Sequence, residues 1–201
     1  MSTSLIILAG GKNLRLGRTK ALETIGGKSL IERVIERLKL LSNQILIVTS
    51  AEQLEFPVGA EAKIVIDLYP GKGPLGGIYT GLLASGSSHG IVVACDMPFL
   101  NADLLNYMIG LSEGYDAVVP RLEKEMVEPL HAVYSRTCLE KMKERLDGGQ
   151  LSIYSFLDTA RVRYVEQEES LRFDPQLLSF FNINYQSDVD RAIALVENEN
   201  N

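Results

Sequence analysis

Residues 5–22 read LIILAGGKNLRLGRTKAL, an apolar run that opens directly into a loop rich in glycine and basic residues. The apolar run, residues 5–9, is continuous and typical of a strand covered on both faces. Glycine lets the backbone approach a ligand and present its N–H groups, while Lys and Arg neutralise phosphate charge. The stretch therefore predicts a triphosphate-binding loop, the alternative being a tight turn with solvated cations. The loop residues concerned are Gly10, Gly11, Gly17, Lys12, Arg15, Arg18 and Lys20.

The pattern of a buried strand followed by a helix continues along the chain. Ser29 with Glu32 predicts a capping box, and Asn101 predicts a second helix N-cap. Helices that alternate with buried strands imply right-handed crossovers and a mostly parallel sheet, with the ligand crevice at the carboxyl ends of its strands. We therefore predict an α/β fold. The further apolar runs lie at residues 45–49, 63–67, 91–95 and 116–120.

The pattern weakens after Pro120. We expect an antiparallel excursion at residues 127–134, a helix at 138–146, a last strand at 180–184 and a C-terminal helix that starts near Ser187. A chain of 201 residues is long enough to bury one core. We therefore expect one domain over residues 1–201, with a nucleotide-binding half at about 1–120 and an acceptor-binding half at about 121–201.

Composition and charge exclude several classes of partner. The net charge of −6 argues against a sequence-independent grip on nucleic acid, which needs a basic face. The apolar run near the start is too short for a signal sequence or a membrane span, so we expect a cytoplasmic protein with no membrane partner. Cys95 and Cys138 offer neither a disulfide framework nor a zinc spacing, and we expect both to be reduced and buried.

Asp96 comes directly after the apolar run in VVACDMPFL, residues 92–100. Ligands gather at the carboxyl edge of a parallel sheet, and a carboxylate at that edge is a natural ligand for Mg²⁺. The alternative interpretation is an Asx cap at a turn. Asp96 is nevertheless our first candidate for a metal ligand.

Three glycines and two histidines allow weaker interpretations. Gly71, Gly73 and Gly76 satisfy G-x-G-x-x-G, but Pro74 lies inside the pattern, so these glycines more naturally let a helix start pack beside a nucleotide. His89 is expected in a turn and His131 on a strand. Neither has a second ligand at a metal-binding spacing, so both are assigned structural roles.

Five motifs follow one another along the chain: LAGGKNLRLGRTKAL (8–22), GPLGGI (73–78), CDMPFL (95–100), EPLHAVY (128–134) and FNINYQSD (181–188). Together and in this order they resemble the molybdenum cofactor guanylyltransferase family. The resemblance implies a single three-layer Rossmann-like domain of the nucleotide-diphospho-sugar transferase type. Each motif alone is shared with cytidylyl and sugar nucleotidyl transferases, whereas the ordered set covers nearly the whole chain.

The resemblance also implies roles for individual residues. The guanine and ribose would lie against the backbone after the first strand, Lys20 and Arg15 would meet the phosphates, and Asp96 would bind Mg²⁺. Thr19, Leu16 and Ser50 depart from the family pattern, and Ser50 offers one hydroxyl where an asparagine is expected. The full predicted binding set is Leu8, Ala9, Gly10, Gly11, Gly17, Lys20, Ser50, Asp67, Gly73, Gly76, Asp96, Asn182 and Asn184, with Lys20, Asp96 and Arg15 as the catalytic residues.

The activity that the resemblance implies is transfer of GMP from GTP to molybdopterin with release of pyrophosphate, in transient contact with other proteins of cofactor biosynthesis or with apo-enzymes. Gly10, in LAGG rather than the LAAG of related cytidylyltransferases, favours guanine. The alternatives are a cytidylyltransferase for the same cofactor, a guanylyltransferase for another phosphorylated acceptor, and a nucleotide-binding regulatory protein without catalysis.

Overall fold

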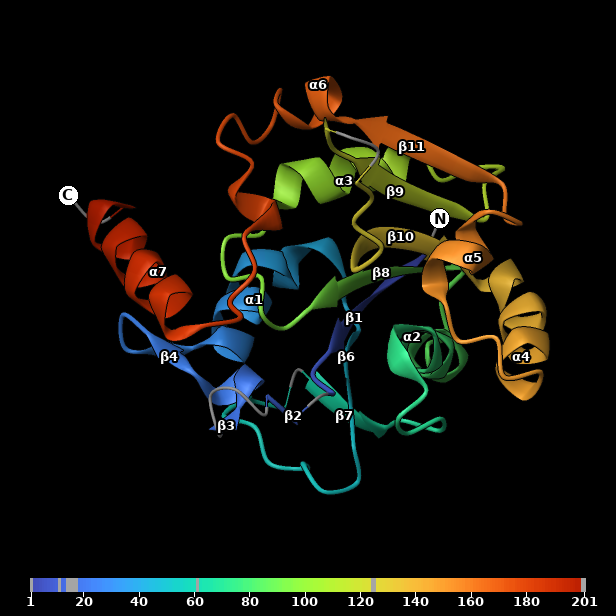
Figure 1. Ribbon diagram of the computed structural model, residues 1–201, viewed down its shortest axis with the longest axis horizontal. Coiled ribbons are helices and arrows are strands. Elements are labelled where there is room, and N and C mark those ends of the chain that lie inside the picture. The colour runs from blue at the N-terminus through green and yellow to red at the C-terminus, as the bar shows by residue number, and fades with distance from the viewer. Residues whose placement is uncertain (1, 11, 14–17, 61, 124–125, 200–201) are drawn as a thin grey trace.

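A seven-stranded sheet forms the centre of the computed structural model, which describes residues 2–10, 12–13, 18–60, 62–123 and 126–199 (Figure 1). Its strands are β1 (Thr3–Leu8), β6 (Ile45–Thr49), β7 (Ala62–Ile66), β8 (His89–Ala94), β9 (Ala117–Arg121), β10 (His131–Ser135) and β11 (Val162–Glu166). They lie in the order β11-β9-β10-β8-β1-β6-β7. Two short antiparallel pairs stand apart from this sheet: β2 (Lys12–Asn13) with β3 (Arg18–Thr19), and β4 (Thr24–Ile25) with β5 (Lys28–Ser29).

The sheet is mostly parallel, as the alternating pattern predicts. β8, β1, β6 and β7 run parallel to one another, with Leu5 opposite both Ile45 and Ile91. β10 runs antiparallel to β8 and to β9, and β11 returns to run parallel to β9. The α/β fold and the antiparallel excursion are therefore confirmed. The single reversed strand brings the start of β10 to the carboxyl end of β8.

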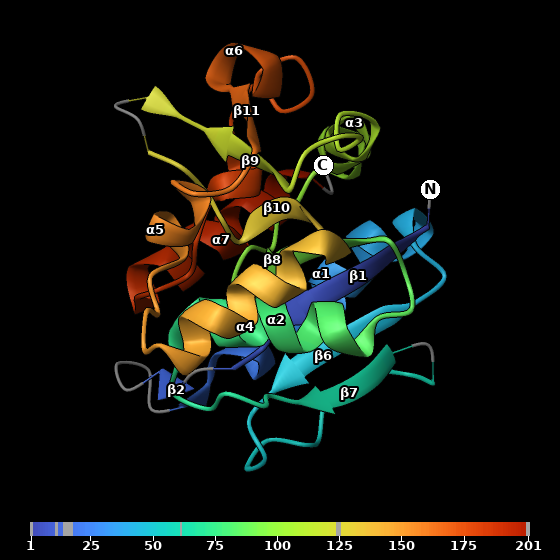
Figure 2. The ribbon, with the colours of Figure 1, turned by 90° about the vertical axis from the view of Figure 1, so that its right-hand side faces the viewer.

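Helices cover both faces of the sheet. α1 (Leu30–Leu38) and α3 (Ala102–Gly110) pack on one face, and α2 (Gly73–Ala84), α4 (Leu139–Asp147) and α5 (Ile153–Leu157) pack on the other. Figure 2 shows α2 and α4 in front of the sheet. Successive strand residues point to opposite faces, so Leu5 and Ile7 join the first core while Ile6 joins the second. The remaining helical segments are η1 (Lys20–Leu22), η2 (Lys39–Leu41), η4 (Arg136–Cys138), α6 (Gln167–Ser170), η5 (Leu178–Phe180) and α7 (Gln186–Glu199).

The predicted helix starts and the first hairpin have a local chemical cause. Ser29 donates its N–H to Glu32 (2.8 Å) and its hydroxyl caps the Glu32 N–H, which confirms the capping box of α1. The Asn101 carboxamide accepts from the Leu104 N–H (2.9 Å) and begins α3. Gly26 and Gly27, with φ of 54° and 81°, turn the chain between β4 and β5, a conformation that glycine adopts without strain.

The predicted strand at residues 180–184 is wrong. This segment follows the short helix η5, and Ile183 donates its N–H to the Asp96 carbonyl (3.0 Å) instead of joining the main sheet. Phe181 and Ile183 pack with Ile25, Phe99 and α7 in a third core cluster, while Phe180 packs against the first cluster. The last strand is instead β11, an edge strand in which the charged residues Arg163 and Glu166 interrupt the apolar pattern. The third cluster therefore holds residues 181–184 beside the end of β8.

The expectations for the cysteines are confirmed, and those for the two histidines are confirmed only in part. Both cysteines are free and buried, as expected. His89 begins β8 and is not in a turn, whereas His131 lies on a strand as predicted. Among the described residues, no helix is long and apolar enough to cross a membrane.

His131 is fully buried at the start of β10, against the ring of Phe180 at 4.9 Å. Neither ring nitrogen reaches a hydrogen-bond partner among the described residues. Burial lowers the pKa of His131 from its ordinary value of 6.5 to about 4. The negative charge of Asp174 and the backbone at Ser179 raise the pKa, but by less than burial lowers it. The folded protein therefore holds this imidazole neutral at pH values where the unfolded chain protonates it.

We predict that His131→Leu weakens the acid sensitivity of folding. Because the pKa of His131 is lower in the folded state, the contribution of this residue to wild-type stability is fully present above pH 6.5. It is lost as the pH falls towards 4. Urea unfolding of both proteins at about pH 7 and about pH 4.5 should show a loss smaller by about 2 to 3 kcal/mol in the variant. Equal losses in the two proteins would contradict the buried neutral ring.

Candidate functional site

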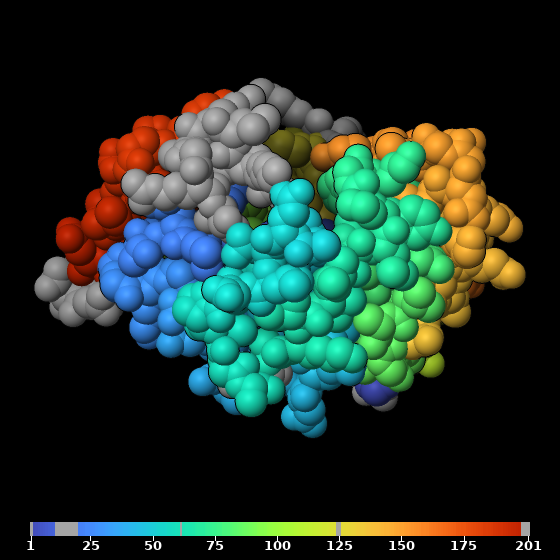
Figure 3. Space-filling view, turned by 90° about the horizontal axis from the view of Figure 1, so that it is seen from below, coloured from blue at the N-terminus to red at the C-terminus, as the bar shows by residue number. Residues whose placement is uncertain are grey.

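A cavity of about 460 Å³ opens at the carboxyl edge of the sheet, over the ends of β8, β1 and β6 and the start of α2. In the space-filling view it is a recess between the cyan surface of the segment after β6 and the green surface near the start of α2 (Figure 3). Its walls combine apolar side chains with a few polar groups, as small-molecule sites do. The lining residues are Leu8, Ala9, Gly10, Lys20, Val48, Thr49, Ser50, Asp67, Pro70, Gly71, Gly73, Pro74, Gly77, Ala94, Cys95, Asp96 and Leu130.

Backbone hydrogen bonds align the exits of the strands that form this cavity. Ala9 donates its N–H to the Val48 carbonyl (2.9 Å), and Cys95 donates to the Leu8 carbonyl (3.1 Å). Asp67 likewise donates to the Thr49 carbonyl (2.7 Å). Each bond extends a parallel ladder by one residue beyond its strand. The polar residues that follow the strands therefore meet at one edge.

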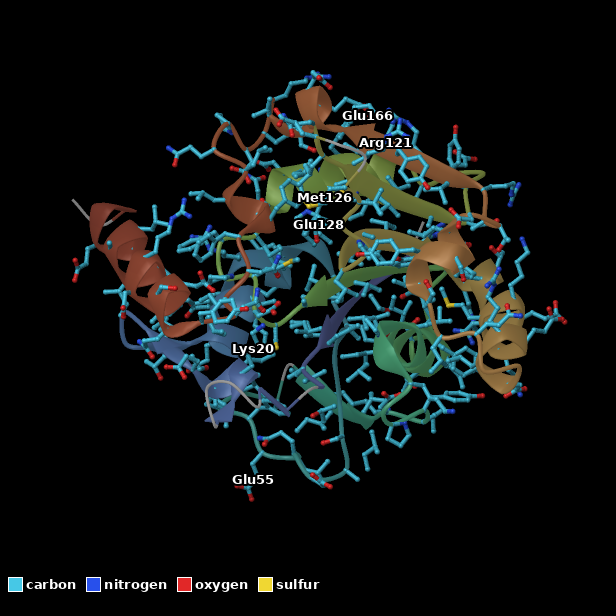
Figure 4. All side chains as sticks on the ribbon, viewed as in Figure 1. Lys20, Glu55, Arg121, Met126, Glu128 and Glu166 are labelled. Carbon is cyan, nitrogen blue, oxygen red and sulfur yellow. The ribbon has the colours of Figure 1, made fainter. Side chains whose placement is uncertain are left out.

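Lys20, Asp96 and Asn184 come together from three distant parts of the chain. Lys20 begins η1, and its Nζ donates to Asp96 Oδ2 and to Asn184 Oδ1, the second at 2.9 Å. Figure 4 shows Lys20 reaching in from the blue N-terminal segment. The Lys20 and Asp96 side chains are only 18% and 16% exposed, so this ion pair is largely shielded from water. A shielded cation beside a cavity is well placed to meet a phosphate.

The second carboxylate oxygen of Asp96 has no partner in the part of the chain that the structure describes. Oδ1 is buried and makes no hydrogen bond within the described residues, while Oδ2 contacts Lys20. An unpaired buried oxygen is costly, and a hard divalent cation would satisfy it. No group of three or more His, Cys, Asp or Glu side chains converges in the described residues. Asp96 could thus hold a metal that takes its other ligands from water and phosphate, an arrangement that suits Mg²⁺.

Asp67 shapes the loop after β7. Its Oδ1 accepts from the Tyr69 N–H (3.0 Å) and from the Thr80 hydroxyl (2.9 Å), which ties this loop to α2. Oδ2 has no hydrogen-bond partner among the described residues and belongs to a side chain that lines the cavity. Asp67 therefore combines a structural role with an acceptor that a ligand could use.

The glycines at the site differ in what surrounds them. A Cβ at Gly76 would lie 2.9 Å from the Tyr69 Cβ, so Gly76 allows α2 to pack against the loop and does not line the cavity. A Cβ at Gly10 would meet nothing within 4 Å, and Gly10 does line the cavity. Gly10 therefore leaves open space where a ligand would lie.

Most of the predicted site residues lie together. Asn184 contacts the site through its hydrogen bond with Lys20. Asn182 instead donates its amide N–H to the Phe180 carbonyl (3.2 Å) and does not line the cavity. Gly11, Arg15 and Gly17 lie outside the described residues. The predicted residues that line the cavity are Leu8, Ala9, Gly10, Lys20, Ser50, Asp67, Gly73 and Asp96.

Thr49 and Leu130 line the cavity but lie outside the set predicted from sequence. The Thr49 hydroxyl is buried without a hydrogen-bond partner among the described residues, in the last position of β6. The sequence does contain a signal for Thr49, because a hydroxyl residue that ends an apolar strand lies at the edge of the sheet where ligands bind. Leu130 could not have been found in this way, because its position depends on the antiparallel pairing of β10 with β8.

Comparisons with known proteins agree with this geometry. The family model described as the MobA-like NTP transferase domain matches residues 5–164. A molybdenum cofactor guanylyltransferase from Desulfosudis oleivorans is 36% identical over 96% of this chain and 95% of its own length. The crystal structure of molybdopterin-guanine dinucleotide biosynthesis protein A from Archaeoglobus fulgidus is 31% identical, with a TM-score of 0.84 over 97% of this chain and 99% of that one.

A more distant structure supports the fold alone. The 2-C-methyl-D-erythritol 4-phosphate cytidylyltransferase from Thermus thermophilus is 19% identical, with a TM-score of 0.73 over 98% of this chain and all of that one. The same arrangement of elements therefore occurs in a protein named for another nucleotide and another acceptor.

We predict that Asp96→Asn leaves stability unchanged within about 1 kcal/mol or raises it, because the substitution removes a poorly satisfied buried charge. Asp116→Asn is the matched control. Asp116 is buried and accepts from the Arg161 N–H (2.9 Å) and guanidinium (3.0 Å), so its substitution should cost about 1 to 3 kcal/mol. Urea unfolding measures both, and an equal loss for Asp96→Asn would mean that this carboxylate serves the fold.

Proposed function

Because this chain belongs to the MobA-like NTP transferase family, we propose that it is a molybdenum cofactor guanylyltransferase, which transfers GMP from GTP to molybdopterin and releases pyrophosphate. The observation that carries the proposal is the Lys20–Asp96 pair at one end of the cavity. A metal-bound triphosphate requires a cation and a carboxylate oxygen that can bind the metal, and Asp96 Oδ1 has no hydrogen-bond partner among the described residues.

The cavity suits a nucleotide in size and in lining. Its volume of about 460 Å³ lies within the usual range for small-molecule sites. We place the guanine and ribose against Leu8, Ala9 and Gly10, where the backbone is accessible, with the triphosphate directed towards Lys20 and Asp96. Thr49 and Ser50 line the β6 side of the same cavity, and Ser50, the more exposed of the two, is a candidate for contact with the nucleoside.

The reaction needs positioning and charge neutralisation more than a protein nucleophile. The terminal phosphate of the acceptor forms a bond to the α-phosphorus of GTP, the bond to the bridging oxygen breaks, and pyrophosphate carries that electron pair away. The attacking phosphate is already an anion, so no protein group has to remove a proton. Mg²⁺, held by Asp96, would draw negative charge from the phosphate oxygens.

Lys20 supplies charge that the protein itself controls. Its Nζ contacts Asp96 and Asn184, and a triphosphate that reaches Asp96 arrives beside this ammonium group. Lys20 can then donate to phosphate oxygens and stabilise the charge that develops in the transition state. Asn184 holds the ammonium group from the other side and limits the positions that it can occupy.

Release of pyrophosphate tests the proposed function. With wild-type protein, GTP, Mg²⁺ and molybdopterin, we expect pyrophosphate and a guanine dinucleotide product in equal amounts. Omission of any one component, or removal of the metal by EDTA, should abolish both. A nucleotide-binding protein without catalysis would bind GTP and release no pyrophosphate in the complete mixture, and that result would contradict the proposal.

Base selection should depend on Gly10. Its space is open and its φ is not left-handed, so the loop accepts a side chain without backbone strain. We predict that the wild type prefers GTP over CTP by roughly a hundredfold in kcat/KM, and that Gly10→Ala lowers GTP use more than CTP use, because a methyl group crowds the larger base. Steady-state kinetics with both nucleotides measure this. Equal or better use of CTP by the wild type would make the protein a cytidylyltransferase.

Lys20→Ala should lower kcat/KM for GTP by about thirtyfold to a thousandfold, which is the effect of losing a charge-assisted contact in the transition state. Lys28→Ala is the matched control, since Lys28 is an exposed lysine paired with Glu36 (2.8 Å) away from the cavity. The control should retain wild-type kinetics. If both variants turned over GTP like the wild type, Lys20 would have no phosphate role.

A further inference from the structure

Glu128 lies at the carboxyl end of β8 without lining the nucleotide cavity. It stands three residues before β10, which runs antiparallel to β8, so the start of β10 meets the end of β8. Ala94 donates its N–H to the Leu130 carbonyl (3.0 Å) and fixes this junction two residues from Asp96. Figure 4 shows Glu128 on the opposite side of the strand ends from Lys20.

The backbone at Glu128 is held firmly. Its N–H donates to the Pro120 carbonyl (3.0 Å), and its own carbonyl accepts from the His131 N–H (3.1 Å). Pro129 follows directly and restricts Glu128 to extended conformations. Pro129 in turn accepts from the Tyr134 hydroxyl (2.9 Å). The side chain therefore projects from a rigid part of the sheet edge.

The carboxylate of Glu128 has no hydrogen-bond or ion-pair partner among the described residues, although it is half-buried. Burial raises its pKa, and the negative charge of Asp96 raises it further. Neighbouring acidic residues are paired: Glu166 with Arg121 (2.5 Å) and Glu169 with Arg163 (2.6 Å). Glu128 is thus a carboxylate that the fold positions without giving it a partner from the described residues.

Its location separates Glu128 from the nucleotide. The cavity extends from Asp96 over β1 and β6 to Asp67, which follows β7, whereas Glu128 stands on the β10 side of Asp96. A carboxylate repels phosphate, so Glu128 would oppose the binding of a phosphate group beside it. It would favour a ligand group that presents N–H donors. The second substrate has to approach Asp96 from the side that the nucleotide leaves open, which is the side of Glu128.

We propose that Glu128 binds the acceptor, with its carboxylate accepting hydrogen bonds from ring N–H groups of the pterin. The inference rests on the proposed function and adds the residue that recognises the second substrate. The pterin ring carries uncharged N–H donors, which satisfy the carboxylate that its phosphate would not. The same negative charge disfavours a second triphosphate on this side, so Glu128 also directs GTP to the cavity.

Glu128→Gln tests this role, with Glu55→Gln as the control. Glu55 is exposed on the segment after β6, so its substitution makes the same change in charge away from the β10 side (Figure 4). In the Glu128 variant we expect the KM for molybdopterin to rise about ten- to a hundredfold, with the KM for GTP and kcat nearly unchanged. Wild-type GTP affinity, measured by calorimetry, confirms that the variant is folded.

A direct binding measurement separates this inference from the proposed function. Fluorescence titration of 6-hydroxymethyl-7,8-dihydropterin in the presence of GTP should show binding to the wild type and to Glu55→Gln, and about tenfold or more weaker binding to Glu128→Gln. The titration needs no turnover, so it still reports on Glu128 if pyrophosphate release fails. Absence of dihydropterin binding to the wild type, or equal binding by all three proteins, would overturn the inference.

Discussion

The contact between Lys20 and Asp96 is the interaction on which the proposed site depends. It joins a residue near the start of the chain to one at the end of β8. Asp96 directly follows a strand of the main sheet, and Lys20 belongs to η1, which packs on the first core through Ala21. The Asp96 oxygen that finds no partner in the described part of the chain is a cost to the folded state, which the two packed faces of the sheet offset. A metal-bound triphosphate would satisfy that oxygen and draw Lys20 to a phosphate.

The reversal of β10 divides the carboxyl edge into two sides. The parallel strands β8, β1, β6 and β7 carry the cavity, while the start of β10 and residues 181–184 close on Asp96 from the other direction. The third core cluster anchors this returning segment through Phe99 and α7. Two substrates that both carry phosphate can therefore approach one carboxylate from different elements. Asn184, beside Lys20, lies where the two sides meet.

The parts of the fold that local chemistry determines could be predicted from sequence. Buried parallel strands have continuous apolar runs, and the caps at Ser29 and Asn101 need only side chains close in sequence. The strand β11 could not be found in this way, because an edge strand keeps charged residues. Residues 180–184 resemble a strand, yet their apolar side chains fill a cluster that only tertiary packing creates. Of the site, Asp96 followed from its place after a strand, whereas Glu128 and Leu130 required the pairing of β10.

A crystal structure with Mg²⁺ and the GTP analogue that carries a methylene group between its α- and β-phosphorus atoms tests the central claim most directly. We predict the triphosphate between Lys20 and Asp96, a metal ion on Asp96 Oδ1, and Lys20 Nζ in contact with a phosphate oxygen. The β10 side of Asp96 should stay open for the acceptor. A nucleotide bound elsewhere, with the contact between Lys20 and Asp96 unchanged, would contradict the account.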